Sequence, residues 1–256
     1  MEPTRYVEVG TTVPAVSRRT PPLWLYLLRR IGVVGFIAVV PWCLWVAWQA
    51  LSGLGSWIML SIGMFLGYAL TDLLSGLVHW ASDRFGTVDT PLIGCALIEP
   101  FRTHHGHPNA ITGEDIFELN GLNCFIATIV LGICVPVIGQ WAPDAWAPGA
   151  YGCVCMMGWG IPLASQIHQW VHRDTPPTVI RIFQSWGLVI DASAHDAHHA
   201  HGAVDDYCIV SGWWNAPCRS IGLYRRLESV LVHRFGFQMT DDCAALGAQR
   251  LPRPRD

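Results

Sequence analysis

The most informative stretch of the chain is residues 56–79, with the sequence SWIMLSIGMFLGYALTDLLSGLVH. Its first 16 residues carry no charge, and the whole stretch exceeds the roughly 20 apolar residues that cross a bilayer as a helix. Gly63 and Gly67 are spaced so that a neighbouring helix can approach closely. We therefore predict a membrane-spanning helix that ends at His79.

Three further apolar stretches complete a set of four predicted spans. Pro41 lies inside the first span, where a membrane helix tolerates proline as a kink. Residues 52–55 connect the first two spans, and residues 140–149 connect the last two, with Trp141 and Trp146 as interface anchors. The predicted fold is therefore all-α: an integral membrane protein with four transmembrane helices in two hairpins. The other three predicted spans are Ile31–Leu51, Cys124–Gly139 and Ala150–His168.

The composition agrees with a membrane protein. The 256 residues are 52% hydrophobic and 14% charged, whereas globular domains have about 25% charged residues. This excludes a disordered chain, and a net charge of -3 provides no basic field for nucleic acid. A soluble, very apolar helical bundle remains an alternative. The nine cysteines include no CxxC pair, so a disulfide scaffold or a cysteine zinc site is not expected. Five lie in apolar runs and are expected to be small core residues: Cys43, Cys124, Cys134, Cys153 and Cys155.

The 16 basic residues, all arginine, predict the orientation in the membrane. Five precede the first span, two lie between the second and third spans, and nine follow the fourth, so neither hairpin loop contains one. Because cytoplasmic loops carry the excess of positive charge, both termini and residues 80–120 are expected in the cytoplasm. This asymmetry disfavours the soluble bundle. We expect an N-terminal tail over residues 1–30, a membrane domain over 31–242 and a C-terminal tail over 243–256, in a bacterial inner membrane.

Ten of the eleven histidines collect at this predicted cytoplasmic face. His79 and Asp83 are four residues apart, so both project from one face of a helix that continues beyond the membrane. His168 and His172 repeat that spacing, and closely spaced histidines follow in both cytoplasmic segments. The candidate metal ligands are His79, Asp83, His104, His105, His168, His172, His195, His198 and His199.

The size of this set indicates more than one metal ion. Imidazole suits iron, zinc, copper and nickel, so the residue types alone do not identify the metal. Two ions with open positions for oxygen would use eight histidines and one carboxylate. We expect His107 and His201 to orient ligands or face solvent, and His233 to be structural.

Five other polar residues lie near the predicted site. Arg102 can hold a lipid phosphate through two hydrogen bonds, or it is an ordinary surface arginine. The other four lead into the third span and either orient the histidines, add a weak ligand, or cap the helix and face water. They are Asp115, Glu118, Asn120 and Asn123.

Two apolar segments near the histidines are too short to span a membrane. Residues 180–190 and 207–218 contain tryptophan and little charge. We expect both to lie on the bilayer as interfacial helices and to cover the metal site.

Several motifs resemble the lipid desaturase domain of plasmanylethanolamine desaturases, the group that includes the bacterial CarF proteins. The resemblance runs from about residue 68 to 242 and agrees in residue type, order and spacing. The motifs are Asp72-x-x-Ser75-Gly76-Leu77-Val78-His79-Trp80 with Asp83, Pro100-Phe101-Arg102-x-His104-His105, Ile111-Thr112, Asn120-Gly121-x-Asn123-Cys124, Gln166-Ile167-His168-x-Trp170-x-His172, His195-x-x-His198-His199, Gly212-Trp213-x-Asn215 and Arg225-Arg226-Leu227-Glu228.

This resemblance implies a membrane di-iron desaturase in which the nine candidate ligands hold two iron ions and O2 is the co-substrate. Members of the family convert the alkyl ether chain of a phospholipid to a vinyl ether, which makes a plasmalogen. Two electrons come from the substrate, and two more come from a partner such as a cytochrome b5 or a ferredoxin. A side-chain nucleophile is not required.

Three other functions stay open. A fatty-acyl or glycerolipid desaturase, or a hydroxylase, would use the same metal set. A membrane zinc hydrolase would need fewer ligands and no reductant. A haem-binding signalling protein would use His79 and His168 as axial ligands, although two histidines would then suffice.

Overall fold

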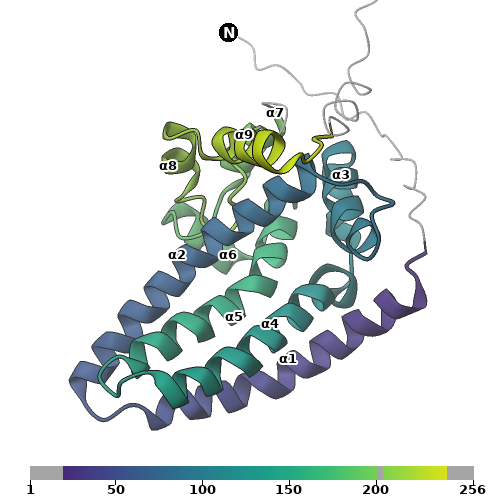
Figure 1. The fold of residues 1–256 in the computed structure, drawn as a ribbon. Helices are drawn as coiled ribbons and strands as arrows, with labels where there is room; N and C mark the ends of the chain where they lie inside the picture. Colours follow the sequence, from purple (N-terminus) through teal and green to yellow (C-terminus); the bar gives the residue numbers. More distant parts are fainter. Residues whose placement is uncertain (1–19, 201–203, 241–256) are drawn as a thin grey trace, which may run out of the picture.

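Four long helices form the body of the molecule in the computed structural model, which describes residues 20–200 and 204–240 (Figure 1). Within the described residues every named element is a helix, which confirms the all-α prediction. The long helices are α1 (Leu23–Gln49), α2 (Leu54–Arg84), α4 (Ile116–Trp141) and α5 (Ala147–Val171).

The long helices pack in the order α2, α5, α4, α1. The predicted second hairpin, α4 and α5, is a packed pair. The first is not: α1 and α2 are joined by a short turn but diverge from it, and they lie at opposite sides of the helical layer (Figure 1). A short connection constrains only one end of each helix, so the sequence could not distinguish a packed hairpin from a splayed one.

Glycines allow α2 and α5 to touch backbone to backbone. A Cβ atom added at Gly63 would lie 1.9 Å from the carbonyl oxygen of Gly149. One added at Gly67 would lie 2.4 Å from the carbonyl oxygen of Cys153. The close helix approach that the Gly63–Gly67 spacing permits is therefore made by α5.

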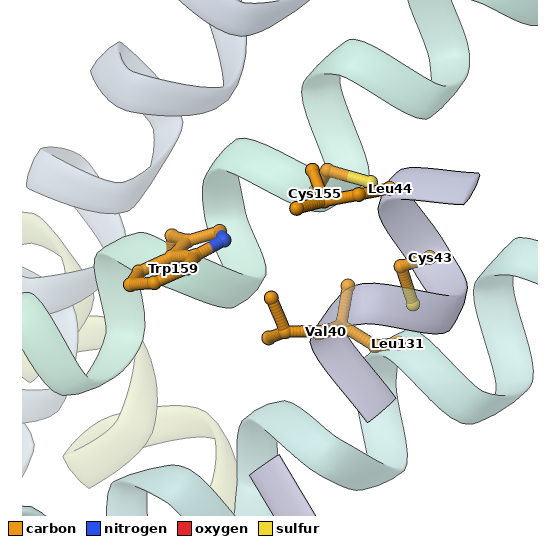
Figure 2. A pocket seen from close by; sticks show the side chains of 6 residues that line it. All are labelled: Val40, Cys43, Leu44, Leu131, Cys155 and Trp159. Atoms are coloured by element: carbon orange, nitrogen blue, oxygen red, sulfur yellow. The ribbon is translucent and has the colours of Figure 1, made fainter. Parts of the chain in front are cut away.

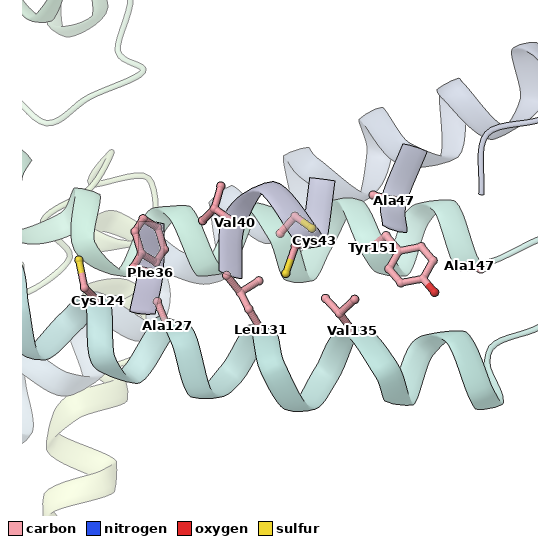
Figure 3. Packing of buried hydrophobic residues seen from close by; sticks show 11 residues of the cluster. Phe36, Val40, Cys43, Ala47, Cys124, Ala127, Leu131, Val135, Ala147 and Tyr151 are labelled. Atoms are coloured by element: carbon pink, nitrogen blue, oxygen red, sulfur yellow. The ribbon is translucent and has the colours of Figure 1, made fainter. Parts of the chain in front are cut away.

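The contact between α1, α4 and α5 buries an apolar core (Figure 3). Phe36 and Val40 of α1 meet Leu131 of α4. Of the five cysteines predicted as core residues, Cys43, Cys124 and Cys155 are buried here, whereas Cys134 and Cys153 are only half-buried. A small apolar hollow beside this core has no room for a water molecule and is a packing gap rather than a ligand site. Its lining, shown in Figure 2, is Val40, Cys43, Leu44, Leu131, Cys155 and Trp159.

Three of the four predicted spans, now α1, α2 and α4, are long and apolar enough to cross a membrane. Their outer faces carry exposed apolar side chains such as Ile37 and Phe65. The fourth predicted span, α5, has 25 residues but is not among these helices. Glycine, proline and polar residues dilute its apolar character, and α2 and α4 cover it on two sides. The four-span topology therefore stays a prediction.

All four long helices begin earlier than predicted, α2 and α5 by two or three residues and α1 and α4 by eight. α1 begins at Leu23 rather than Ile31, so residues 23–30 are helical rather than part of a tail. α4 begins at Ile116 rather than Cys124. Arg29 and Arg30 separate the apolar residues 23–28 from the rest of α1, and Glu118, Asn120 and Asn123 interrupt the first turns of α4, so an uninterrupted apolar run begins only after them.

Shorter helices form a cap at the end of the bundle opposite the turns (Figure 1). The interfacial position expected for residues 207–218 is wrong for their first part, because Tyr207 and Val210 have no exposed surface and pack against α2 and α5. The short elements are the π-helix η1 (Gly94–Ile98), α3 (Glu99–Gly106), the 3-10 helix η2 (Pro108–Gly113), α6 (Thr178–Ser185), α7 (Ala192–Ala200), α8 (Asn215–Ser220) and α9 (Leu223–Phe235).

Candidate metal centre

The last turns of α2 supply two of the candidate ligands. His79 and Asp83 lie one turn apart, and neither has any exposed surface. The helix continues regularly through both residues to Arg84. The predicted helical spacing is therefore correct, and it directs both side chains into the cap rather than into solvent.

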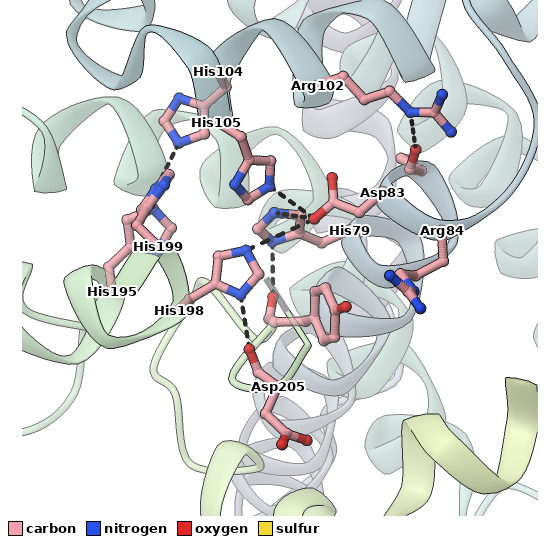
Figure 4. Close-up of polar contacts among 12 residues, drawn as sticks. His79, Asp83, Arg84, Arg102, His104, His105, His195, His198, His199 and Asp205 are labelled. Atoms are coloured by element: carbon pink, nitrogen blue, oxygen red, sulfur yellow. Dashed lines mark hydrogen bonds and ion pairs between the residues drawn. The ribbon is translucent and has the colours of Figure 1, made fainter. Parts of the chain in front are cut away.

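One group of ligand atoms surrounds the carboxylate of Asp83 (Figure 4). The Oδ2 atom of Asp83 lies 2.8 Å from Nε2 of His105, 3.4 Å from Nε2 of His79 and 3.7 Å from Nε2 of His198. All four ligand atoms lie within 4.8 Å of one another. These residues, called the Asp83 group below, can hold one metal ion.

A second group, called the His168 group, consists of five imidazoles. Nε2 of His168 lies 2.9 Å from Nε2 of His104 and 3.0 Å from Nε2 of His195. Nε2 of His199 lies 3.1 Å from that of His104 and 3.0 Å from that of His195, which closes a four-membered ring of nitrogens. Two ligand nitrogens that each lie about 2.1 Å from a metal ion, with a right angle between the two bonds, are about 3.0 Å apart. The nitrogen spacing in this ring therefore fits one metal ion. The members are His104, His168, His172, His195 and His199.

The two groups lie next to each other. The ring centroids of His105 and His199, one from each group, are 5.0 Å apart, and those of His79 and His168 are 5.9 Å apart. All nine predicted ligands belong to one group or the other, and no further described residue joins either group. The fold thus brings together residues from four helices, α2, α3, α5 and α7, as two adjacent candidate metal sites.

Backbone carbonyls orient two imidazoles of the Asp83 group. Nδ1 of His79 donates to the carbonyl oxygen of Tyr207 at 3.1 Å, and Nδ1 of His198 donates to that of Asp205 at 2.7 Å. With the proton on Nδ1, the lone pair of each ring lies on Nε2. Both Nε2 atoms are buried without a hydrogen-bond partner in the described chain. A metal ion would satisfy them, and such outer hydrogen bonds are typical of metal-binding histidines.

The surroundings favour the neutral form of the imidazoles in the cap. Burial and the neighbouring imidazoles lower the pKa values of His104 and His195 well below the usual 6.5. Burial, with a smaller contribution from His105, lowers the pKa of His172 to about 4, and burial is the main cause that lowers that of His199 to about 3. A neutral imidazole carries the lone pair that binds a metal, so the site keeps these residues in their ligand form.

Arg102 is not the ordinary surface arginine that one of its two expected roles required. Its side chain is only 2% exposed, and its described hydrogen bonds are made within the protein. The guanidinium donates to the carbonyl oxygens of Ser82, Phe85 and Gly86 and to Oγ1 of Thr240. Arg102 thus joins the end of α2, which carries Asp83, to α3, which carries His104 and His105.

The polar residues at the start of α4 have structural roles. Asp115 caps the helix: its Oδ1 accepts hydrogen bonds from the backbone nitrogens of Phe117 and Glu118, and Glu118 itself is exposed. Capping and exposure were one of the three expected roles for this pair. Asn123 donates to the hydroxyl of Ser165 at 2.6 Å, which connects α4 to α5. Neither group of ligand atoms includes any of these residues.

Asn120 belongs to an amide network beside the metal ligands. It donates to Gln166, and Gln166 in turn donates to Gln169. Gln169 donates to the backbone carbonyls of Ile111 and Glu114. These glutamines flank His168 on α5, so the network supports the expectation that Asn120 helps to orient the histidines. This role of Gln166 and Gln169 was not predictable from their place in a sequence motif.

The remaining histidines lie apart from the two groups. His107 is exposed at the end of α3, and His233 is exposed on α9. Neither is a member of a ligand group. His201 lies outside the described residues.

Asp72 is a buried residue whose role its sequence motif did not reveal. Its Oδ1 accepts hydrogen bonds from the backbone nitrogens of Val210, Ser211 and Gly212, at 2.9–3.1 Å. This carboxylate therefore holds the segment after Tyr207 against α2. A charged residue inside an apolar span was the available signal, because a membrane helix rarely carries one without a partner.

A family comparison agrees with this geometry. Residues 68–242 match the model described as the lipid desaturase domain. This chain belongs to the lipid desaturase domain family. The assignment confirms the resemblance seen in the motifs, and every residue of the Asp83 and His168 groups lies inside the matched region.

Relatives of this lipid desaturase family member come from bacteria, animals and plants. The chain is 34% identical over 203 residues to "Plasmanylethanolamine desaturase" of Myxococcus xanthus, covering 77% of this chain and 69% of that protein. It is 35% identical over 174 residues to "Plasmanylethanolamine desaturase 1" of Mus musculus, covering 66% and 64%. It is 32% identical over 190 residues to "Fatty acid desaturase 4-like 1, chloroplastic" of Arabidopsis thaliana, covering 73% and 62%. The aligned region is thus less than two thirds of the mouse and plant proteins. No solved structure matches the chain.

Proposed function

We propose that this chain is a membrane di-iron desaturase that introduces the vinyl ether double bond into alkyl ether phospholipids, which is plasmalogen synthesis. The observation that carries the proposal is the pair of adjacent ligand groups, centred on Asp83 and His168, at one end of an apolar helical bundle. The names of the Myxococcus and mouse relatives supply the substrate class.

The nine ligand residues are suited to bind iron ions that react with O2. Bound iron supplies the oxidising power to remove hydrogen from an unactivated C–H bond, which side chains alone cannot do. Nine ligands shared between two ions also exceed what a single hydrolytic zinc ion requires. In the overall reaction the –O–CH2–CH2– unit, O2, two electrons and two protons yield –O–CH=CH– and two water molecules.

The position of the site along α2 supports oxidation next to the ether oxygen. His79 lies 25 residues after Leu54, or about 37 Å along the helix, whereas the hydrocarbon core is about 30 Å thick. A site at this height lies at the level of the lipid head groups. The first two carbons of an ether chain lie at this level, whereas the middle of an acyl chain lies deeper in the bilayer.

In this proposal the residues of the chain bind the metal ions, orient the ligand side chains and exclude water from the site. The eight histidines and Asp83 hold the metal ions, and the backbone carbonyls of Tyr207 and Asp205 set two of the ring orientations. The buried segment 207–211 covers the Asp83 group and excludes water from it. We propose that the site and both termini face the cytoplasm of a bacterial inner membrane, where a cytochrome b5 or a ferredoxin delivers the two external electrons.

The alternatives differ in how well they fit. The name of the Arabidopsis relative favours a fatty-acyl desaturase as the second candidate, with the same metal set. A haem with His79 and His168 as axial ligands does not fit. Nε2 of His168 lies within 3.0 Å of two other imidazole nitrogens, which leaves no space for a porphyrin around it.

Lipid product analysis tests the proposal. The iron-loaded protein is reconstituted in vesicles that contain an alkyl ether phosphatidylethanolamine, with O2 and a chemical reductant. We expect a product that lacks two hydrogen atoms and releases an aldehyde in acid, as vinyl ethers do, and none from His104→Ala. A double bond farther along the chain, or a hydroxylated lipid, would replace the proposal with the second candidate. An unchanged lipid would reject the desaturase assignment.

A further inference from the structure

The outer face of α9 carries an unbalanced positive charge. Arg225, Arg226 and Arg234 are exposed on this 13-residue helix. The only acid on α9 is Glu228, and it faces inward, where its Oε1 accepts from Arg84 Nε at 2.9 Å and from Trp80 Nε1 at 3.1 Å. The exposed face of α9 thus contains arginines but no acidic residue of this helix.

The inner face of α9 connects to the Asp83 group through aromatic rings. Tyr224 is 1% exposed and lies next to Arg225 in the chain. Its ring centroid is 4.7 Å from that of Tyr207. The ring of Tyr207 is in turn 4.9 Å from that of His198 and 5.5 Å from that of His79. Two ring contacts therefore join the arginine-bearing helix to candidate metal ligands.

The position of α9 makes its arginines accessible to a soluble partner. The helix packs against Trp80 and Arg84 at the end of α2 (Figure 1). Trp80 lies 26 residues after Leu54, or about 39 Å along the helix, beyond the roughly 30 Å hydrocarbon core. The arginines of α9 thus lie at or beyond the level of the lipid head groups, outside the hydrocarbon core, where a soluble partner can reach them.

We propose that α9 is the docking face for an acidic one-electron carrier protein, and that Tyr224 and Tyr207 form the electron path to the Asp83 group. The inference rests on the proposed desaturase function. In each of two encounters, the carrier loses one electron and the metal centre gains one. Together they supply the two external electrons that reduce O2 to water alongside the two from the substrate. Opposite charges on the two surfaces would steer the encounter.

A binding measurement tests the docking face independently of activity. The probes are the soluble domain of a cytochrome b5 and a plant-type ferredoxin, both acidic, each titrated onto the full chain in lipid nanodiscs. Arg225→Glu/Arg226→Glu should weaken binding of at least one carrier by about tenfold or more, and added salt should weaken wild-type binding. The matched control is Arg181→Glu, on exposed α6, which should bind as wild type does.

Two results would overturn the docking face. One is equal binding of both carriers by wild type and the double variant. The other is that the double variant binds the carriers normally but loses binding to phosphatidylglycerol vesicles, which would assign α9 to the membrane surface.

Stopped-flow reduction of the metal centre by the bound carrier tests the path. Tyr224→Leu removes a ring from the path and should slow reduction several-fold at unchanged carrier affinity, whereas Tyr224→Phe keeps the ring and should stay close to wild type. Iron content and thermal unfolding of each variant show that the fold is intact. An unchanged rate in Tyr224→Leu would overturn the path. A small chemical reductant bypasses α9, so absence of vinyl ether from wild type with that reductant would instead reject the proposed function.

Discussion

Nε2 of His168 lies 2.9 Å from Nε2 of His104, although 64 residues separate these two residues in the chain. Two ring nitrogens at this distance repel each other unless a proton or a cation lies between their lone pairs. Each also has a further imidazole nitrogen within 3.1 Å, so single protons do not satisfy the whole ring. The packing of α3 against α5 and α7 therefore creates a position for a cation.

The first prediction concerns the ligands. Alanine at His79, His104, His168 or His199 should abolish vinyl ether formation and reduce bound iron, while the protein remains in the membrane fraction, because each change removes a ligand atom. Product analysis and iron content per chain are the measurements. Full activity in two of these variants would contradict the metal sites.

Two exposed histidines provide matched controls for these variants. His107 is three residues from His104 but belongs to neither ligand group, and His233 lies on α9. Alanine at either position should leave product formation and iron content close to wild type. Loss of iron in His107→Ala would mean that the ligand set is incomplete.

The second prediction concerns Arg102, which positions ligands without touching the metal. Arg102→Lys keeps the charge but loses the fork that reaches the carbonyls of Ser82, Phe85 and Gly86. We expect about 10- to 100-fold weaker metal affinity, as measured by iron retained during dialysis against a chelator. Arg181→Lys is the control and should retain iron normally. Equal retention in both variants would exclude a positioning role.

The third prediction concerns Asp72. Asp72→Asn removes the charge that accepts three backbone hydrogen bonds from residues 210–212, and should cost about 2–3 kcal/mol of stability. Ser75 accepts a single bond from Ile209, so Ser75→Ala should cost only about 1 kcal/mol. Thermal unfolding in detergent, followed by tryptophan fluorescence, compares the two. Equal losses would show that the carboxylate has no special role in anchoring this segment.

The fourth prediction concerns the contact between α2 and α5. Gly63→Ala places a methyl group 1.9 Å from a backbone oxygen of α5 and should destabilise the protein by about 1–3 kcal/mol. Gly132 of α4 has nothing within 4 Å of an added Cβ, so Gly132→Ala should be neutral or slightly stabilising. Thermal unfolding of both variants is the measurement, and similar transitions would contradict the close helix contact.

The ligand set could be predicted from the sequence because its information is local. Spacings of three and four residues place side chains on one helical face, and His79, Asp83, His168 and His172 follow that rule in the structure. The division into two groups was not predictable. It depends on how α3 and α7 approach α2 and α5, which no short-range pattern encodes.

The errors share a physical origin in tertiary packing. An arginine outside the spans is expected at the surface, but Arg102 is buried because carbonyl oxygens at the end of α2 accept hydrogen bonds from its guanidinium group. The composition of residues 207–210 is typical of an interfacial segment, but Asp72 holds this segment against α2 through the backbone nitrogen of Val210. An apolar run of that length suits either lipid or protein surroundings, and only the position of a distant polar partner decides between them.

The central claim is that the Asp83 and His168 groups hold two iron ions. Elemental analysis of the full chain, purified from cells grown with iron and zinc, tests it most directly. The account predicts two iron atoms per chain in wild type, with fewer in His168→Ala and in His105→Ala, which removes a ligand of the Asp83 group. One zinc atom and no iron per chain would contradict it.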